Sequence, residues 1–124
     1  KIIIDKLIVK FELSQLIHKQ INEISDGERQ RAYIAKTFAQ NTPLILLDEP
    51  TAFLDIAHKI SLFNLLLDMT HSQQCSTIVS SHDLDLLLTH CDELWLIQGN
   101  EIITIAHEQF NTQNIKELII QDNK

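Results

Sequence analysis

The sequence predicts an α/β fold in which crossover helices connect the strands of a parallel sheet. Residues 44–47 form an apolar run without alternation, as expected of a strand that is buried on both faces. Residues 77–80 form a second strand pattern, and apolar residues recur at helical spacing between the two runs: Ile56, Ile60, Phe63 and Leu67. A strand, a helix and a strand in this order predict a right-handed unit.

The N-terminal 40 residues are predicted to be helical. An amphipathic helix is expected over residues 1–11, where apolar side chains recur at helical spacing: Ile4, Leu7, Ile8 and Phe11. A short helix is expected around residues 13–18, followed by a loop. Ser25 is predicted to cap a further helix that runs to about Gln40, with three residues on its packed side: Ala35, Phe38 and Ala39. The tripeptide Asn-Thr-Pro at 41–43 ends that helix.

The C-terminal part is predicted to contain a helix, an antiparallel hairpin and a final short helix. The first helix is indicated by Leu84, Leu87, Leu88 and Cys91. Residues 93–97 and 101–105 flank Gly99 and Asn100, which predicts a hairpin. The last helix is indicated by Ile115, Leu118 and Ile119.

Composition limits the function classes. A chain of 124 residues fits one domain at most, and a hydrophobic fraction of 44% is ample for a packed core. The formal net charge of −7 argues against a free-standing nucleic-acid-binding protein, which would normally carry a basic face. No stretch approaches the roughly eighteen uninterrupted apolar residues of a membrane-spanning helix.

Four short motifs follow one another along the chain. Residues 24–31 read Ile-Ser-Asp-Gly-Glu-Arg-Gln-Arg, and the strand pattern at 44–47 is followed directly by Asp-Glu-Pro at 48–50. Residues 51–55 read Thr-Ala-Phe-Leu-Asp, and residues 81–83 read Ser-His-Asp. In this order the motifs resemble the nucleotide-binding domain of ATP-binding cassette (ABC) proteins.

The resemblance implies a partial P-loop NTPase domain over residues 1–124. Residues 1–40 would be part of the helical subdomain with the signature helix, and residues 41–124 would be the core with the Walker B, D-loop and H-loop motifs. The family holds its own nucleotide in a Gly-rich phosphate loop. With Gly27 and Gly99 as its two glycines, this chain holds no such loop. We therefore expect it to be the C-terminal part of a longer domain and to be inactive as an ATPase by itself.

The signature motif implies contacts to ATP that a second subunit holds. Ser25, Gly27 and Glu28 are the implied residues, since a helix N-terminus presents N–H groups to an anion. Ser25 and Glu28 also fit a simple capping box, which needs no ligand. The carboxylates of Asp26 and Glu28 would each repel a phosphate charge ~8 Å away by about 2 kcal/mol at an effective dielectric of ~20. That repulsion is tolerable if Glu28 caps the helix and Asp26 faces solvent.

The other implied site residues follow the two strands. Asp48 would hold Mg²⁺ through water, and Glu49 would act as general base on the attacking water. His82 matches the switch histidine that contacts the γ-phosphate, and Asp55 matches the D-loop aspartate at the dimer interface. The alternatives are solvated acids at a strand end for Asp48 and Glu49, an N-cap for Asp55, and a structural role for His82.

The resemblance implies the ATP-binding and ATP-hydrolysing subunit of an ABC importer, with ATP and Mg²⁺ as cofactors. The variant at 25–31, Ser-Asp-Gly-Glu-Arg-Gln-Arg, resembles importers of iron chelates, haem and cobalamin. The expected partners are a second copy of the subunit and transmembrane permease subunits, with no nucleic acid, at the cytoplasmic face of the cell membrane. Two alternatives stay open: the ABC-like head of a chromosome-organising or DNA-repair ATPase, and a non-catalytic regulatory fragment.

Overall fold

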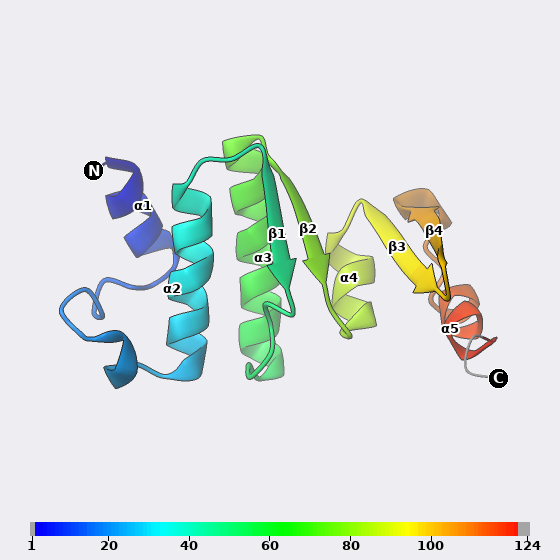
Figure 1. The fold of residues 1–124 in the computed structure, drawn as a ribbon, viewed down its shortest axis with the longest axis horizontal. Coiled ribbons are helices and arrows are strands. Elements are labelled where there is room, and N and C mark those ends of the chain that lie inside the picture. The colour runs from blue at the N-terminus through cyan, green and yellow to red at the C-terminus, as the bar shows by residue number, and fades with distance from the viewer. Residues whose placement is uncertain (1, 122–124) are drawn as a thin grey trace. The chain divides into compact units, whose positions relative to one another are not determined.

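The computed structural model describes residues 2–121 and divides into two compact units, Lys1–His82 and Asp83–Lys124. Figure 1 shows the order of helices and strands along the chain. The predicted α/β class is confirmed, because a parallel strand pair with a helical connection lies in the first unit. None of the described helices is long and apolar enough to cross a membrane.

The first unit begins with helix α1 (Ile2–Lys10), the short 3₁₀ helix η1 (Ile21–Glu23) and helix α2 (Asp26–Ala39). The helix predicted around residues 13–18 is wrong, since these residues form hydrogen-bonded turns. Glu12 has a φ of 57°, so the chain reverses after α1 and carries Leu13 back into the core. Ala39 and Ile4 are exposed, although their spacing placed them with the packed residues.

Strand β1 (Leu44–Asp48), helix α3 (Ile56–Gln73) and strand β2 (Ser76–Ser80) form the predicted crossover unit. The strands pair in parallel from Leu44 opposite Ser76 to Asp48 opposite Ser80. The prediction that residues 44–47 are buried on both faces is wrong. Ile45 is buried, but Leu46 is 66% exposed, because the helices of this unit cover one face of the strand pair.

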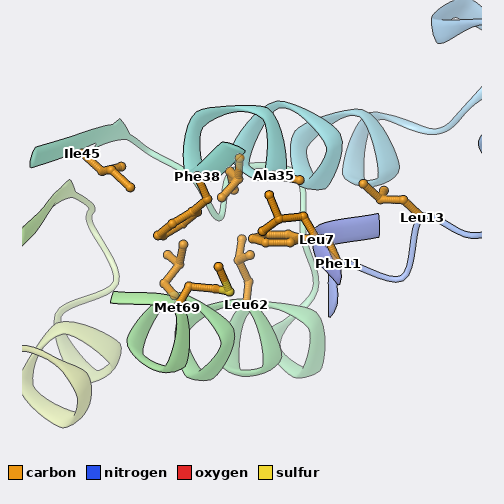
Figure 2. Close-up of a cluster of buried hydrophobic side chains, with 10 residues drawn as sticks. Leu7, Phe11, Leu13, Ala35, Phe38, Ile45, Leu62 and Met69 are labelled. Carbon is orange, nitrogen blue, oxygen red and sulfur yellow. The ribbon is translucent and has the colours of Figure 1, made fainter. Parts of the chain in front are cut away.

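The core of the first unit lies between α1, α2 and α3, as Figure 2 shows. Phe11 and Phe38 are fully buried, and their ring centroids lie 6.1 Å apart. Helix α3 contributes Leu62, Leu66 and Met69 to the same cluster. This packing holds α2 and α3 together within the unit.

The second unit contains helix α4 (Leu84–His90), strands β3 (Glu93–Gln98) and β4 (Glu101–Ala106), η2 (His107–Gln109) and helix α5 (Thr112–Gln121). The predicted hairpin is confirmed, since β3 and β4 pair antiparallel from Glu93 opposite Ala106 to Gln98 opposite Glu101. Gly99 supplies the φ of +55° that the turn requires. Ile115 is buried on α5, and the side chain of Leu118 lies outside the described residues.

Candidate functional site

The N-terminus of α2 is closed by a capping box. The Glu28 N–H donates to Ser25 Oγ at 3.2 Å, and the Ser25 N–H donates to Glu28 Oε2 at 2.8 Å. The hydrogen bond from the Ser25 N–H, followed by the Ser25 side chain, holds the pKa of Glu28 below its ordinary value. The capping interpretation of this motif is therefore confirmed.

The capping box occupies the Glu28 carboxylate with the N–H of the N-cap residue Ser25. The Asp26 side chain is 70% exposed and lies 3.3 Å from Arg29 Nη1. Glu28 therefore caps the helix and Asp26 faces solvent, which are the two conditions for tolerating these carboxylates beside a phosphate. By helix geometry the N–H groups of Asp26 and Gly27 have no acceptor inside α2, so this end suits an anion.

Gly27 packs closely against the loop that precedes α3. A Cβ added at Gly27 would lie 2.9 Å from Leu54 Cδ2, which is closer than real Cβ contacts. The sequence pattern had indicated Gly27 for its backbone N–H. The structure adds a second reason, because a side chain at residue 27 would require the end of the Leu54 side chain to shift.

A cleft of about 470 Å³ lies between the end of α1, the N-terminus of α2 and the loop that precedes α3. Four of the predicted site residues contribute to its walls: Ser25, Gly27, Glu28 and Asp55. Asp48, Glu49 and His82 are not part of that lining. The described chain therefore places the predicted residues in two separate groups.

Asp55 caps α3 and holds a histidine that sequence reasoning missed. Its Oδ1 accepts the His58 N–H at 3.0 Å, and its Oδ2 lies 2.7 Å from His58 Nδ1. These contacts, the backbone N–H first, hold the pKa of Asp55 below its ordinary value. His58 is exposed, and its spacing of three residues from the N-cap Asp55 is the signal that could have identified this contact.

The second group lies at the carboxyl ends of the parallel strands. Ser80 is the register partner of Asp48, and its hydroxyl donates to Asp48 Oδ1. The Glu49 N–H donates to both the carbonyl oxygen and the hydroxyl oxygen of Ser80, each at 3.1 Å. His82 Nε2 lies 3.1 Å from Glu49 Oε1. The fold thus brings together Asp48, Glu49 and His82 and adds Ser80, which the sequence had not indicated.

The backbone between the two groups contains left-handed residues. Glu49 has a φ of 44° and Phe53 a φ of 68°. For residues with a Cβ this conformation costs roughly 1–2 kcal/mol each. Pro50 and Thr51 are fully buried and anchor the segment, while Phe53 is 87% exposed. Left-handed residues that the surroundings hold in place are common at functional sites.

The carboxylate of Asp48 suits a magnesium ion whose other ligands are water and phosphate oxygens. No group of three or more His, Cys, Asp and Glu gathers as a metal site within the described ranges. Asp48 offers an exposed carboxylate at the end of a strand. Mg²⁺ bound to nucleotide typically takes only one or two carboxylates and fills its other positions with water and phosphate oxygens. Asp48 fits that chemistry.

Comparison with known families and curated proteins identifies relatives. The family model described as "ABC transporter" matches residues 2–52. The cobalamin import ATP-binding protein BtuD of Halobacterium salinarum is 34% identical over 100 residues, which are 81% of this chain and 25% of that protein. The petrobactin import ATP-binding protein FpuD of Bacillus anthracis is 38% identical over 90 residues, 73% of this chain and 33% of that protein.

A third relative, the hemin import ATP-binding protein HmuV of Shewanella denitrificans, is 32% identical over 108 residues, 83% of this chain and 42% of that protein. The chain thus spans between a quarter and less than half of the length of these relatives. Among solved structures, cbiO1 from Clostridium perfringens, part of the ABC transporter complex cbiONQ, has the same fold. Its TM-score is 0.78 at 24% identity, over 98% of this chain and 48% of that chain.

Proposed function

Because this chain is part of an ATP-binding domain of the ABC transporter family, we propose that it belongs to the ATPase subunit of an ABC importer. The observation that carries the proposal is the cluster at the ends of β1 and β2. There a carboxylate on a strand end lies beside Glu49, which His82 contacts at 3.1 Å. The capped N-terminus of α2 supplies the separate anion-binding end.

In this proposal each member of the cluster has a defined role. Glu49 accepts a proton from the attacking water, which requires a carboxylate within hydrogen-bond reach of that water. His82 orients Glu49 and meets the γ-phosphate. Asp48 would hold Mg²⁺ through water, and the ion, when bound, would supply positive charge against the phosphates.

The signature residues act on the nucleotide of a second copy. The cleft lined by Ser25, Gly27 and Asp55 does not include Glu49 or His82, which supports a division of labour between two subunits. In a homodimer, the α2 N-terminus of one subunit would meet the ATP held by the phosphate loop of the other. Asp55 would lie at that interface.

The proposed cargo is an iron chelate, haem or cobalamin. The support comes from relatives that are import ATP-binding proteins for cobalamin, petrobactin and hemin. The subunit would bind transmembrane permease subunits at the cytoplasmic face of the membrane. These relatives give no support to a chromosome-organising or DNA-repair head. The 124 residues alone, with two glycines and no Gly-rich phosphate loop, are not expected to hydrolyse ATP.

The test is Glu49→Gln in the full-length protein. Loss of the charge removes the base and keeps the shape, so we expect ATP binding to persist while turnover falls by about 100-fold or more. Size-exclusion chromatography with ATP should then show a trapped dimer. His82→Ala should also lower turnover severely, and Lys36→Ala on the exposed side of α2 is the control. Near-normal steady-state hydrolysis by Glu49→Gln would contradict the assignment of the base.

A further inference from the structure

Ser80 contacts both residues of the acidic pair, Asp48 and Glu49, and no sequence pattern predicted these contacts. Its hydroxyl donates to Asp48 Oδ1 and accepts the Glu49 N–H at 3.1 Å. Its carbonyl oxygen accepts the same N–H at 3.1 Å. One residue of β2 therefore contacts both acidic residues that follow the apolar run of β1.

The contact to Asp48 orients a carboxylate that has few other constraints. Asp48 is exposed at the end of its strand, so its side chain would otherwise be free to rotate. The Ser80 hydroxyl has a single proton, and that proton engages Oδ1. Oδ2 and the second lone pair of Oδ1 then remain for water around a metal ion.

The contact to Glu49 holds an unfavourable backbone conformation. The φ of 44° at Glu49 lies in the left-handed region, which residues with a Cβ seldom adopt. Both hydrogen bonds of its N–H end on Ser80. With this backbone fixed, the Glu49 carboxylate lies 3.1 Å from His82 Nε2.

We propose that the Ser80 hydroxyl is a positioning group for magnesium-dependent nucleotide hydrolysis, which sets the orientation of Asp48 toward the metal and of Glu49 toward the attacking water. This inference rests on the proposed function, because it concerns the same reaction. Residues that orient metal ligands and catalytic groups typically contribute about 10-fold to 100-fold to metal affinity or activity.

The substitution pair Ser80→Thr and Ser80→Val isolates the hydroxyl. Threonine and valine have nearly the same shape and both suit a strand, but only threonine keeps the O–H. Ser76→Val is the matched control, because Ser76 lies on the same face of β2 at its other end, opposite Leu44. Ser80→Ala provides the comparison with wild type if valine prevents folding.

The experiment uses the full-length protein and two readouts. Steady-state hydrolysis gives kcat and the KM for ATP, and electron paramagnetic resonance gives Mn²⁺ affinity in the presence of a non-hydrolysable ATP analogue. We expect Ser80→Val to lower kcat and Mn²⁺ affinity by about 10-fold each, with little change in KM. Ser80→Thr and Ser76→Val should match wild type in both readouts and in melting temperature.

Two results would overturn the inference. One is a valine variant that matches the threonine variant in kcat and Mn²⁺ affinity. The other is a threonine variant as impaired as the valine variant, which would show that the shape of the side chain matters and the hydroxyl does not. Failure of the proposed function is distinguishable, because wild type would then bind or hydrolyse no ATP, whatever the variants do.

Discussion

At the scale of single residues, the site depends on short-range contacts around two loops. Gly27 allows the signature segment to lie against Leu54, and Ser25 with Glu28 closes the helix end that would face a phosphate. Asp55 is held in the same way by His58. In each case one or two hydrogen bonds, or one absent side chain, set the position of a segment beside the cleft.

The lowered pKa of Glu28 predicts a pH-dependent stability. Because the pKa is lower in the folded than in the unfolded chain, the charged carboxylate stabilises the fold above the ordinary glutamate pKa of about 4.3. That contribution is lost as pH falls through the lower folded pKa. Glu28→Gln keeps a capping oxygen but no charge, so it should melt at a lower temperature than wild type near pH 7.

The difference in melting temperature between wild type and Glu28→Gln should shrink steadily below about pH 4. Circular dichroism melts across this range measure it. Glu101→Gln, at an exposed strand end, is the control for loss of one negative charge. A difference that stays constant from neutral to acidic pH would contradict the role of the charged Glu28 in the cap.

At the scale of helices and strands, packing of α1 on α2 and α3 stabilises the elements that line the cleft. Phe11 is fully buried at the end of the α1 segment, and the cleft beside the signature motif includes it in its wall. Lys10 and Asp68 form an exposed ion pair between α1 and α3, a type of contact that contributes little. Apolar burial, rather than this pair, holds α1 in place.

Phe11→Ala should therefore destabilise the protein by about 3–5 kcal/mol, the usual cost of a large cavity in a core. Val9→Ala near the end of α1, where Val9 is 69% exposed, should change stability by no more than about 0.5 kcal/mol. Urea unfolding measures both. Phe11→Leu keeps most of the volume and gives a milder value if alanine prevents folding. Equal effects at positions 9 and 11 would contradict the packing described for α1.

At the scale of the whole chain, the strand pair of the first unit has an apolar face that is exposed. Leu44, Leu46 and Ile78 share the face of β1 and β2 opposite the helices, and they are 48%, 66% and 38% exposed. Within the described residues, each strand of the pair also has one edge without a partner strand. Uncovered strands of this kind pair with other chains.

We predict that the 124-residue chain self-associates in solution through this surface. Light scattering at several concentrations should show a mass that rises with concentration. Leu46→Lys places a charge on the uncovered face and should reduce the association, whereas Gln15→Lys on an exposed turn should not. A monodisperse monomer at every concentration would contradict the prediction.

The sequence alone predicted those features that depend on local order. The Ser25 cap, the crossover unit and the Gly99 turn follow from spacing and from residue chemistry within one turn or one strand. The order of the four motifs indicated the family, which the comparisons support. Local patterns fail where the outcome depends on neighbours, as at residues 13–18, where core packing of Leu13 replaced a helix by turns.

Tertiary structure alone revealed which side chains meet. The Ser80 hydroxyl contacts an aspartate 32 residues away, and Gly27 meets Leu54 across the beginning of two helices. Strand register decides the first contact and helix packing decides the second. Neither leaves a periodic signal in the chain. Burial of β1 on one face also depends on tertiary structure. An apolar run shows that both faces of a strand can be buried, but the neighbouring elements determine which face is buried.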